Sequence, residues 1–147
     1  MDSKDTLRQF NSIMKDIDDI YRGMAKKYGM GECSFWIIYT LRLADEPMTQ
    51  SGICSQMYQP KQTVNSAIKK LESDGIIQTV FYEDKRKKFI FLTDKGKAIA
   101  RNTADMIIDA EMQSFGSFSG EKQNMLLEML RNYSISMRNI TERCEKK

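Results

Sequence analysis

The chain of 147 residues contains no histidine. Histidine is the side chain that most often serves as general base and metal ligand, so its absence argues against an enzyme and against a metal centre. The three cysteines, Cys33, Cys54 and Cys144, are widely spaced and form no CxxC pair, which argues against a disulfide framework and a zinc site. We expect no catalytic residues, no metal and no cofactor.

Long apolar runs are missing as well. No stretch approaches the roughly 18 apolar residues of a membrane-spanning helix. The first ten residues, MDSKDTLRQF, mix acids with bases and contain no apolar segment of a secretory signal. These features predict a cytoplasmic protein without a membrane partner. Only 2 prolines and 8 glycines interrupt the chain, which favours a few long helices over many short strands.

The net charge of +3 is unevenly distributed along the chain. Residues 1–58 carry 7 basic and 8 acidic side chains, residues 59–101 carry 10 and 5, and residues 102–147 carry 6 and 7. A positive excess confined to the middle third indicates an anionic partner, and nucleic acid is the first candidate. A solvated lysine-rich surface would have the same composition, so the pattern of the segment has to discriminate between the two.

Both ends of the chain have the apolar spacing of long amphipathic helices. Such faces could pack on each other, on the core, or on a second copy of the chain. Ser119 is predicted to cap the last helix. The repeating apolar residues are Leu7, Phe10, Met14, Ile17, Tyr21 and Met24 in the first segment and Leu126, Leu130, Tyr133, Met137 and Ile140 in the last.

The pattern changes several times between these ends. Residues 33–44 are apolar on nearly all sides and predict a buried helix. A short helix over 49–58, capped by Thr49, precedes a turn at Gln59-Pro60 and a longer helix over 60–74. These two consecutive helices have the arrangement of a helix-turn-helix.

The apolar period then falls toward two. Residues 76–82 and 88–92 are β-branched and aromatic, which predicts a β-hairpin with a charged tip. A hairpin beside a helix-turn-helix is a wing, whose arginine can enter a narrow minor groove. Thr93 is predicted to cap one further helix that extends to residue 115.

The helix over 60–74 carries the clearest functional pattern. Its inward stripe is Val64, Ala67, Ile68 and Leu71, and its opposite face has no carboxylate before Glu72. A solvated helix usually interleaves glutamate with lysine. Amides and hydroxyls can read base edges, whereas lysines pair with phosphates. The residues that we assign to DNA contact are Lys61, Gln62, Thr63, Asn65, Ser66, Lys69 and Lys70 on this helix and Asp84, Lys85, Arg86, Lys87 and Lys88 at the hairpin tip, where Asp84 would orient the Arg86 guanidinium.

Four short motifs occur in the order and spacing of one protein family. They are Lys61-Gln62-Thr63-Val64-Asn65, then Leu71-Glu72 with Gly75-Ile76-Ile77, then Asp84-x-Arg86, and finally Leu92-Thr93 with Gly96. With its length and element order, essentially the whole chain resembles the MarR family of bacterial winged helix-turn-helix regulators. The resemblance implies a homodimer that binds a pseudo-palindromic operator, with recognition helix 60–74 in the major groove and wing 83–88 in the minor groove. It further implies a transcriptional repressor released by a small aromatic or phenolic effector.

We therefore expect a mainly α protein with a small β-hairpin wing, in one domain over residues 1–147. Within it, residues 33–101 would form the winged helix-turn-helix module, 94–115 a linking helix, and 1–32 and 119–147 the dimerisation helices. One recognition helix and one wing cover too little DNA for useful specificity, which favours a dimer. A generic globular protein would instead bury such apolar stripes in its own core. The expected dimer contacts are Leu7, Phe10, Met14, Ile17, Leu126, Leu130, Tyr133, Met137 and Ile140.

Two further sets of residues are candidates for sensing a ligand or an oxidant. Tyr21, Trp36 and Tyr39 could line an effector pocket, although such aromatic residues more often belong to an ordinary core. Cys33 is the candidate redox residue because a helix N-terminus would lower the pKa of its thiol. Cys54 is expected to be a small buried packing residue.

The alternative function is that of a protein–protein adaptor on a winged-helix scaffold that has lost DNA binding. The helix face without a carboxylate before Glu72 disfavours this alternative.

Overall fold

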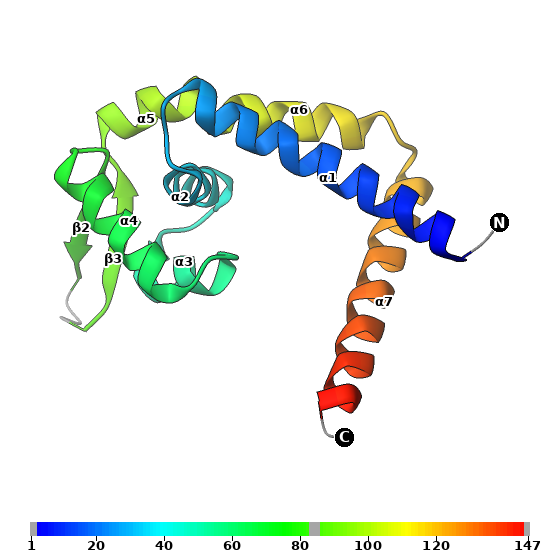
Figure 1. Ribbon diagram of the computed structural model, residues 1–147. Coiled ribbons are helices and arrows are strands. Elements are labelled where there is room, and N and C mark those ends of the chain that lie inside the picture. The colour runs from blue at the N-terminus through cyan, green and yellow to red at the C-terminus, as the bar shows by residue number, and fades with distance from the viewer. Residues whose placement is uncertain (1–2, 83–85, 146–147) are drawn as a thin grey trace. The chain divides into compact units, whose positions relative to one another are not determined.

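The computed structural model describes residues 3–82 and 86–145. It is mainly α-helical with a small antiparallel sheet, as the sequence predicts (Figure 1). The chain divides into two compact units, Met1–Ile108 and Asp109–Lys147. None of the helices in the described ranges has the length and apolarity to span a bilayer. The elements are α1 (Ser3–Lys27), α2 (Glu32–Leu43), β1 (Met48–Thr49), α3 (Gln50–Gln56), α4 (Lys61–Ser73), β2 (Ile77–Phe81), β3 (Lys88–Leu92), α5 (Asp94–Arg101), α6 (Ala104–Gly116) and α7 (Gly120–Glu145).

The sheet has the strand order β1-β3-β2, with both pairings antiparallel. The predicted hairpin is confirmed: β2 pairs with β3 from Ile77 opposite Leu92 to Phe81 opposite Lys88. Strand β1 is an addition that the sequence pattern does not predict, because two residues are too few to show a period. Its Thr49 also caps α3 as predicted, since its hydroxyl accepts a hydrogen bond from the Gly52 amide at 3.0 Å.

The core of the first unit lies between α2, α3, α4 and the sheet. Helix α2 is buried around most of its circumference, as its sequence predicts, and α3 contributes Ile53. The predicted inward stripe of α4 is confirmed, because Val64, Ile68 and Leu71 are buried in this core while Ala67 lies half-buried at its edge. This packing fixes which face of α4 points to solvent.

The end of α4 is bound tightly to the start of α5. Gly75 adopts a left-handed conformation with φ of 69°, and the next amide, that of Ile76, donates to the Leu71 carbonyl at 2.9 Å. The Thr93 hydroxyl, which caps α5, donates to the Gly75 carbonyl at 2.6 Å. A Cβ at Gly96 would lie 2.0 Å from the Ile76 carbonyl oxygen, so this approach requires glycine.

The single helix predicted over 94–115 is wrong in one respect: the chain forms two helices, α5 and α6, with a break at Asn102 and Thr103. At the break, backbone amides bond three residues back, from Asn102 to Ile99 and from Thr103 to Ala100. The buried Thr103 hydroxyl donates to the Ile99 carbonyl at 2.8 Å, and the side-chain amide of Asn102 donates to the Ala98 carbonyl at 3.3 Å. Both side chains thus compete for carbonyls that a continuous helix would use.

The second unit consists of the end of α6 and all of α7. Ser119 caps α7 as predicted, with its hydroxyl accepting from the Lys122 amide at 3.4 Å. The Gln123 side chain donates to the Phe115 and Phe118 carbonyls at 2.8 and 3.0 Å, which satisfies acceptors at the end of α6. Helix α7 buries no residue. On its apolar stripe, Leu126 is half-buried, and Leu130, Tyr133, Met137 and Ile140 are exposed.

Candidate functional site

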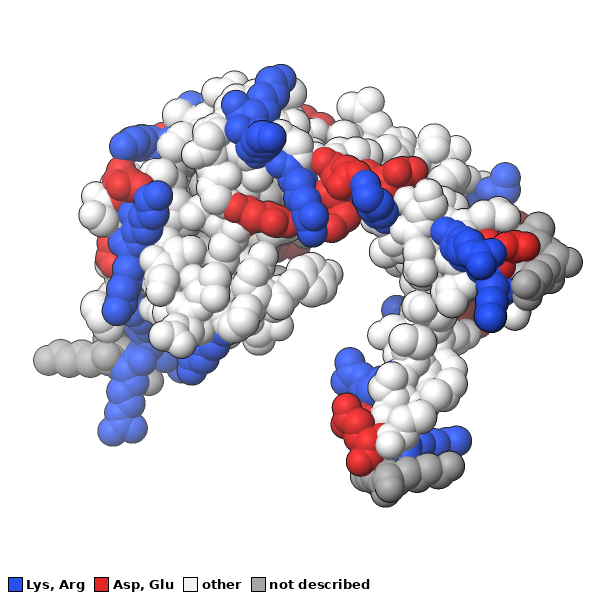
Figure 2. Space-filling model, viewed as in Figure 1, with Lys and Arg blue, Asp and Glu red and all other residues white. Residues whose placement is uncertain are grey.

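The helix-turn-helix presents a surface without negative charge. Helices α3 and α4 are joined by residues 57–60, and Pro60 precedes α4 with an extended backbone. No aspartate or glutamate occurs between Pro47 and Leu71, which includes α3, the turn and α4 up to its last turn, where Glu72 is exposed. Figure 2 shows lysine and arginine side chains on the α4 side of the module. The predicted contact residues that the structure leaves exposed on α4 are Lys61, Gln62, Thr63, Ser66, Lys69 and Lys70.

Asn65 occupies a different position from the other predicted contact residues. It is half-buried, and its side-chain oxygen accepts hydrogen bonds from Gln50 Nε2 at 2.8 Å and from Cys54 Sγ at 3.5 Å. Both donors belong to α3. Helical periodicity places Asn65 on the polar face of α4, but only the packing of α3 beside α4 shows that this edge of the face is a contact between the two helices.

The Ser66 hydroxyl also has a partner within the protein: its proton is donated to the Gln62 carbonyl, one turn earlier, at 3.0 Å. An exposed serine with its proton held in this way keeps its oxygen lone pairs available as acceptors. The other predicted contact groups that α4 exposes are the Gln62 amide, the Thr63 hydroxyl and the lysine ammonium groups, which can bind base edges and phosphates.

The hairpin places cationic and aromatic side chains together. Arg86 and Lys87 are exposed, whereas Lys88 is half-buried opposite Phe81. Asp84 and Lys85 lie outside the described residues, so the expected pairing of Asp84 with Arg86 stays a prediction. Tyr82 contacts Phe89 edge-on, with ring centroids 5.2 Å apart and planes at 82°. The sequence pattern assigns these aromatic residues no role beyond strand formation, and the structure shows that they pack beside the cationic tip.

The three residues predicted as candidates for an effector pocket come together but pack against one another. Trp36 lies with its ring centroid 4.8 Å from that of Tyr21 and 5.1 Å from that of Tyr39. The group adjoins a small core around Phe35 and Ala25. This arrangement favours the reading of an ordinary aromatic core for these residues.

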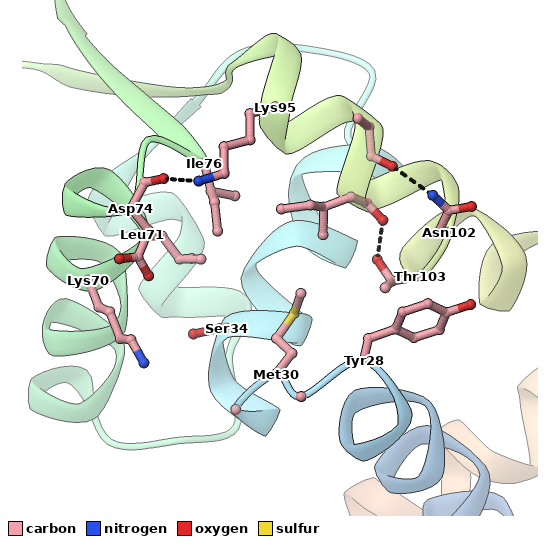
Figure 3. A pocket seen from close by; sticks show the side chains of 14 residues that line it. Tyr28, Met30, Ser34, Lys70, Leu71, Asp74, Ile76, Lys95, Asn102 and Thr103 are labelled. Atoms are coloured by element: carbon pink, nitrogen blue, oxygen red, sulfur yellow. Dashed lines mark hydrogen bonds between the residues drawn. The ribbon is translucent and has the colours of Figure 1, made fainter.

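A cavity of about 500 Å³ lies elsewhere in the first unit (Figure 3). Its walls come from the turn between α1 and α2, the C-terminal end of α4, and the segment from α5 to the α5–α6 break. Met30, Leu71 and Ile76 provide apolar lining, while Lys70 and Asp74 add charged groups. None of Tyr21, Trp36 and Tyr39 lines it, and sequence reasoning missed it because its residues come from segments far apart in the chain.

One hydrogen bond crosses from α5 to α4 beside this cavity. Lys95 Nζ donates to the Asp74 carbonyl at 2.7 Å, and both residues line the cavity (Figure 3). A molecule in the cavity would therefore touch both the end of α4 and the helix that holds it in place.

Among the cysteines, the pKa of the Cys33 thiol differs from expectation. Burial, together with the nearby Cys54, raises the pKa of the Cys33 thiol above its ordinary value, so the expected lowering by a helix N-terminus is wrong. Burial removes the thiol from water and so disfavours its charged, thiolate form. Cys54 is half-buried against the core and bonded to Asn65, while Cys144 is exposed.

Comparison with known proteins identifies the central module. The family described as winged helix DNA-binding domain matches residues 33–96. Among curated proteins, the uncharacterized HTH-type transcriptional regulator YwoH of Bacillus subtilis is 27% identical over 128 residues, which covers 82% of this chain and 93% of that protein.

Solved structures extend the similarity to nearly the whole chain. A MarR family regulator from Neisseria meningitidis is 25% identical with a TM-score of 0.76, covering 97% of this chain and 99% of its own. A MarR family transcriptional regulator from Streptomyces coelicolor, solved in complex with DNA, has a TM-score of 0.67 at 22% identity and covers 89% of this chain and 84% of its own. The second likeness is one of fold.

Proposed function

Since this chain belongs to the MarR family of winged-helix transcriptional regulators, we propose that it represses transcription as a homodimer bound to a pseudo-palindromic operator. The family is regulatory rather than enzymatic, and a DNA-binding fold accounts for the basic central segment. The observation that carries the proposal is the exposed face of α4, which has no carboxylate before Glu72, within a helix-turn-helix that contains no acidic residue from Pro47 to Leu71.

In the proposed complex, α4 lies in the major groove. Gln62, Thr63 and Ser66 reach base edges, while Lys61 and Lys69 approach phosphates, because amides and hydroxyls carry sequence information and ammonium groups mainly supply affinity. Arg86 enters the adjacent minor groove from the wing. The structural likeness to a regulator solved in complex with DNA supports this placement of the module.

The proposed dimer is formed by the terminal helices. Helix α7 buries none of its residues within the chain, and on α1 the predicted dimer residues Leu7, Met14 and Ile17 are exposed. Apolar faces of this length are costly to leave in water, and a second copy of the chain would cover them at matching positions. Residues 1–32 and 119–147 would then be dimerisation segments around a DNA-binding module at 33–101.

We further propose that a small aromatic or phenolic effector binds the cavity lined by Met30, Leu71 and Ile76. A ligand changes DNA affinity only if it binds the free and DNA-bound conformations differently. The cavity adjoins the C-terminal end of α4, so a bound ring that altered the Lys95–Asp74 contact would change how α4 is presented to DNA.

Selection of bound duplexes from a random DNA pool tests the central proposal. We expect an enriched sequence with two inverted half-sites about one helical turn apart, 10–10.5 base pairs, and an affinity that falls steeply with salt. Enrichment of a single half-site would contradict the dimer. Absence of salt-sensitive binding to any duplex would contradict the DNA-binding function and support the protein–protein adaptor.

The effector proposal needs a separate test. A panel of simple phenols and benzoate would be titrated into the protein–operator complex, with fluorescence anisotropy of labelled DNA as the readout. We expect release of DNA by at least one compound, and loss of that release in Ile99→Trp, which fills part of the cavity. Equal release from the wild type and the variant would place the effector elsewhere.

A further inference from the structure

The side chain of Asn65 is held by its oxygen alone. Oδ1 accepts one hydrogen bond from Gln50 Nε2 at 2.8 Å and a second from the Cys54 thiol at 3.5 Å. A carbonyl oxygen has two lone pairs, so these two donors use its accepting capacity. The oxygen therefore faces α3, and the amide nitrogen is the part of Asn65 that remains for another partner.

We infer that the amide nitrogen of Asn65 reaches solvent, because it is absent from the fully buried, unpartnered polar atoms of the described residues. Within residues 3–82 and 86–145, the buried side-chain nitrogen and oxygen atoms without a hydrogen-bond partner belong to Gln59 and Thr79, and Asn65 is not among them. The residue itself is half-buried in the first half of α4. This is the part of a recognition helix whose side chains reach base edges. Asn65 thus presents two N–H donors, and no acceptor, on the side of α4 that adjoins α3.

We propose that Asn65 determines base specificity as a donor only, and that Gln50 and Cys54 are positioning residues that enforce this by occupying its oxygen. The inference rests on the proposed DNA-binding function. An unrestrained asparagine reads adenine with both ends of its amide, accepting from N6 and donating to N7. With the oxygen occupied, the adenine N6 amino group finds no acceptor on Asn65.

The consequence is a change in which purine is preferred. Guanine presents two acceptors, N7 and O6, to the major groove, whereas adenine presents one acceptor and one donor. A donor-only amide fits guanine at least as well as adenine. An asparagine whose oxygen had no partner in the protein would instead be able to pair with adenine through both ends of its amide.

The two α3 donors also reduce the cost of binding. An asparagine side chain on a helix surface otherwise loses rotamer freedom when it contacts a base, and contacts from Gln50 and Cys54 restrict that freedom before DNA arrives. The pair thereby couples the first helix of the helix-turn-helix to base reading by the second.

The experiment measures base preference in the selected operator, position by position, by competition binding of duplexes that carry single substitutions. Asn65→Ala first identifies the base pair that Asn65 reads, as the position whose preference it removes. At that position we expect wild-type protein to bind guanine as well as or better than adenine. The double variant Gln50→Leu, Cys54→Ala frees the oxygen, and we expect its preference to move toward adenine by about tenfold, the size of one good bidentate contact.

Matched variants separate this role from a structural one. Cys54→Ser keeps a hydrogen-bond donor to Asn65 and should retain the wild-type preference. Fluorescence of Trp36, the single tryptophan of the chain, shows whether each variant is folded. A variant that only disturbed the packing of α3 on α4 would weaken binding to all duplexes alike and would not change which purine is preferred.

Three results overturn the inference. The first is an adenine preference of about tenfold or more in wild-type protein at the position that Asn65 reads. The second is an unchanged purine preference in the double variant. The third is operator binding in which Asn65→Ala alters no base preference. Each of them leaves DNA binding itself intact, whereas failure to bind any duplex would remove the proposed function as well.

Discussion

Arg42 and Asp105 form a bidentate ion pair between the last turn of α2 and the first turn of α6. Arg42 Nη2 lies 2.5 Å from Asp105 Oδ2, and Arg42 Nε lies 2.7 Å from Oδ1. The two side chains are 32% and 26% exposed, so water screens the pair only in part. Because Asp105 lies two residues after the break at Asn102 and Thr103, this pair ties the first turn of α6 to α2.

Loss of this pair should destabilise the first unit in a pH-dependent way. The hydrogen bond and the charge of Arg42 hold the pKa of Asp105 below its ordinary value of 3.8. A lowered pKa in the folded state stabilises the fold above the unfolded pKa, and this stability is lost as pH falls through the folded value. Asp105→Asn should therefore lower the free energy of unfolding by about 1 kcal/mol near neutral pH.

Urea unfolding followed by Trp36 fluorescence measures this difference. Wild-type and Asp105→Asn protein should converge in acid, well below the ordinary pKa, where the wild-type carboxyl is protonated. Asp109→Asn removes an exposed carboxylate on the same helix and should change stability by less than about 0.5 kcal/mol. A difference between wild type and Asp105→Asn that persisted unchanged in acid would show that the pair acts through packing instead of charge.

Gly96 should tolerate no side chain. A Cβ at this position would lie 2.0 Å from the Ile76 carbonyl oxygen, which is backbone and is held by the Thr93 amide and hydroxyl. Gly96→Ala must therefore push α5 away from the end of α4, at a cost of roughly 2–4 kcal/mol. Thermal unfolding followed by circular dichroism measures it.

The matched control is Gly23→Ala on α1. A Cβ at Gly23 would meet nothing within 4 Å, and Gly23 lies in the interior of helix α1. Alanine there should raise stability by up to about 1 kcal/mol through helix propensity alone. If Gly96→Ala were as stable as wild type, the tight contact between α4 and α5 would not exist in solution.

A charge on the predicted stripe of α7 should dissociate the dimer. Leu130 is 41% exposed within one chain and lies on the stripe of Leu126, Tyr133 and Met137, so Leu130→Glu would place a carboxylate in the proposed interface. Sedimentation velocity should show a monomer. Ile135→Glu changes a residue about 140° around the helix from Leu130, and the protein should remain a dimer. The same sedimentation for both variants would refute the stripe as the contact face.

Arg86→Ala should weaken operator binding without affecting dimerisation or folding. A single arginine that enters a narrow minor groove contributes locally to affinity, and its removal leaves α4 contacts in place. We expect a loss of about tenfold in a gel-shift titration, which corresponds to roughly 1.4 kcal/mol. Unchanged affinity would remove the wing from the DNA contact.

Salt dependence should distinguish phosphate contacts from other lysines. Each phosphate contact adds about 0.9 to the negative slope of log affinity against log salt. Lys69→Ala should reduce the slope by about 1 and weaken specific and non-specific duplexes alike. Lys122→Ala, in the first turn of α7, should leave the slope unchanged. An identical slope in both variants would show that Lys69 does not contact phosphate.

The helices and the hairpin were predictable because local rules decide them. The inward stripe of α4 follows from helical spacing of Val64, Ile68 and Leu71, and the cap of α3 follows from Thr49 before Gln50. The break between α5 and α6 was missed because Asn102 and Thr103 interrupt a helix only if their side chains bond the preceding carbonyls. The helical spacing of apolar residues runs on from one side of the break to the other, so the sequence pattern gives no sign that the helix ends there.

For the candidate site, the sequence predicted which face of α4 is exposed, but not which residues on that face have partners within the protein. Spacing along one helix places Gln62, Ser66 and Lys69 on the solvent side of α4, and the structure leaves them exposed. The same spacing includes Asn65, yet Gln50 and Cys54 bind its oxygen. The lowered pKa expected for Cys33 fails for a related reason: burial depends on neighbours from other helices, and helix position alone does not reveal it.

The sequence by itself determined the helix-turn-helix and the hairpin, the apolar faces, a helix face without carboxylates before Glu72 and the resemblance to a family, because each depends on residue type and on spacing along one segment. Only the tertiary structure decided that Asn65 is held by α3, that Tyr21, Trp36 and Tyr39 pack on one another, and that the cavity lies beside the end of α4. These features depend on contacts between segments distant in the chain, and such contacts arise only when several helices pack at once.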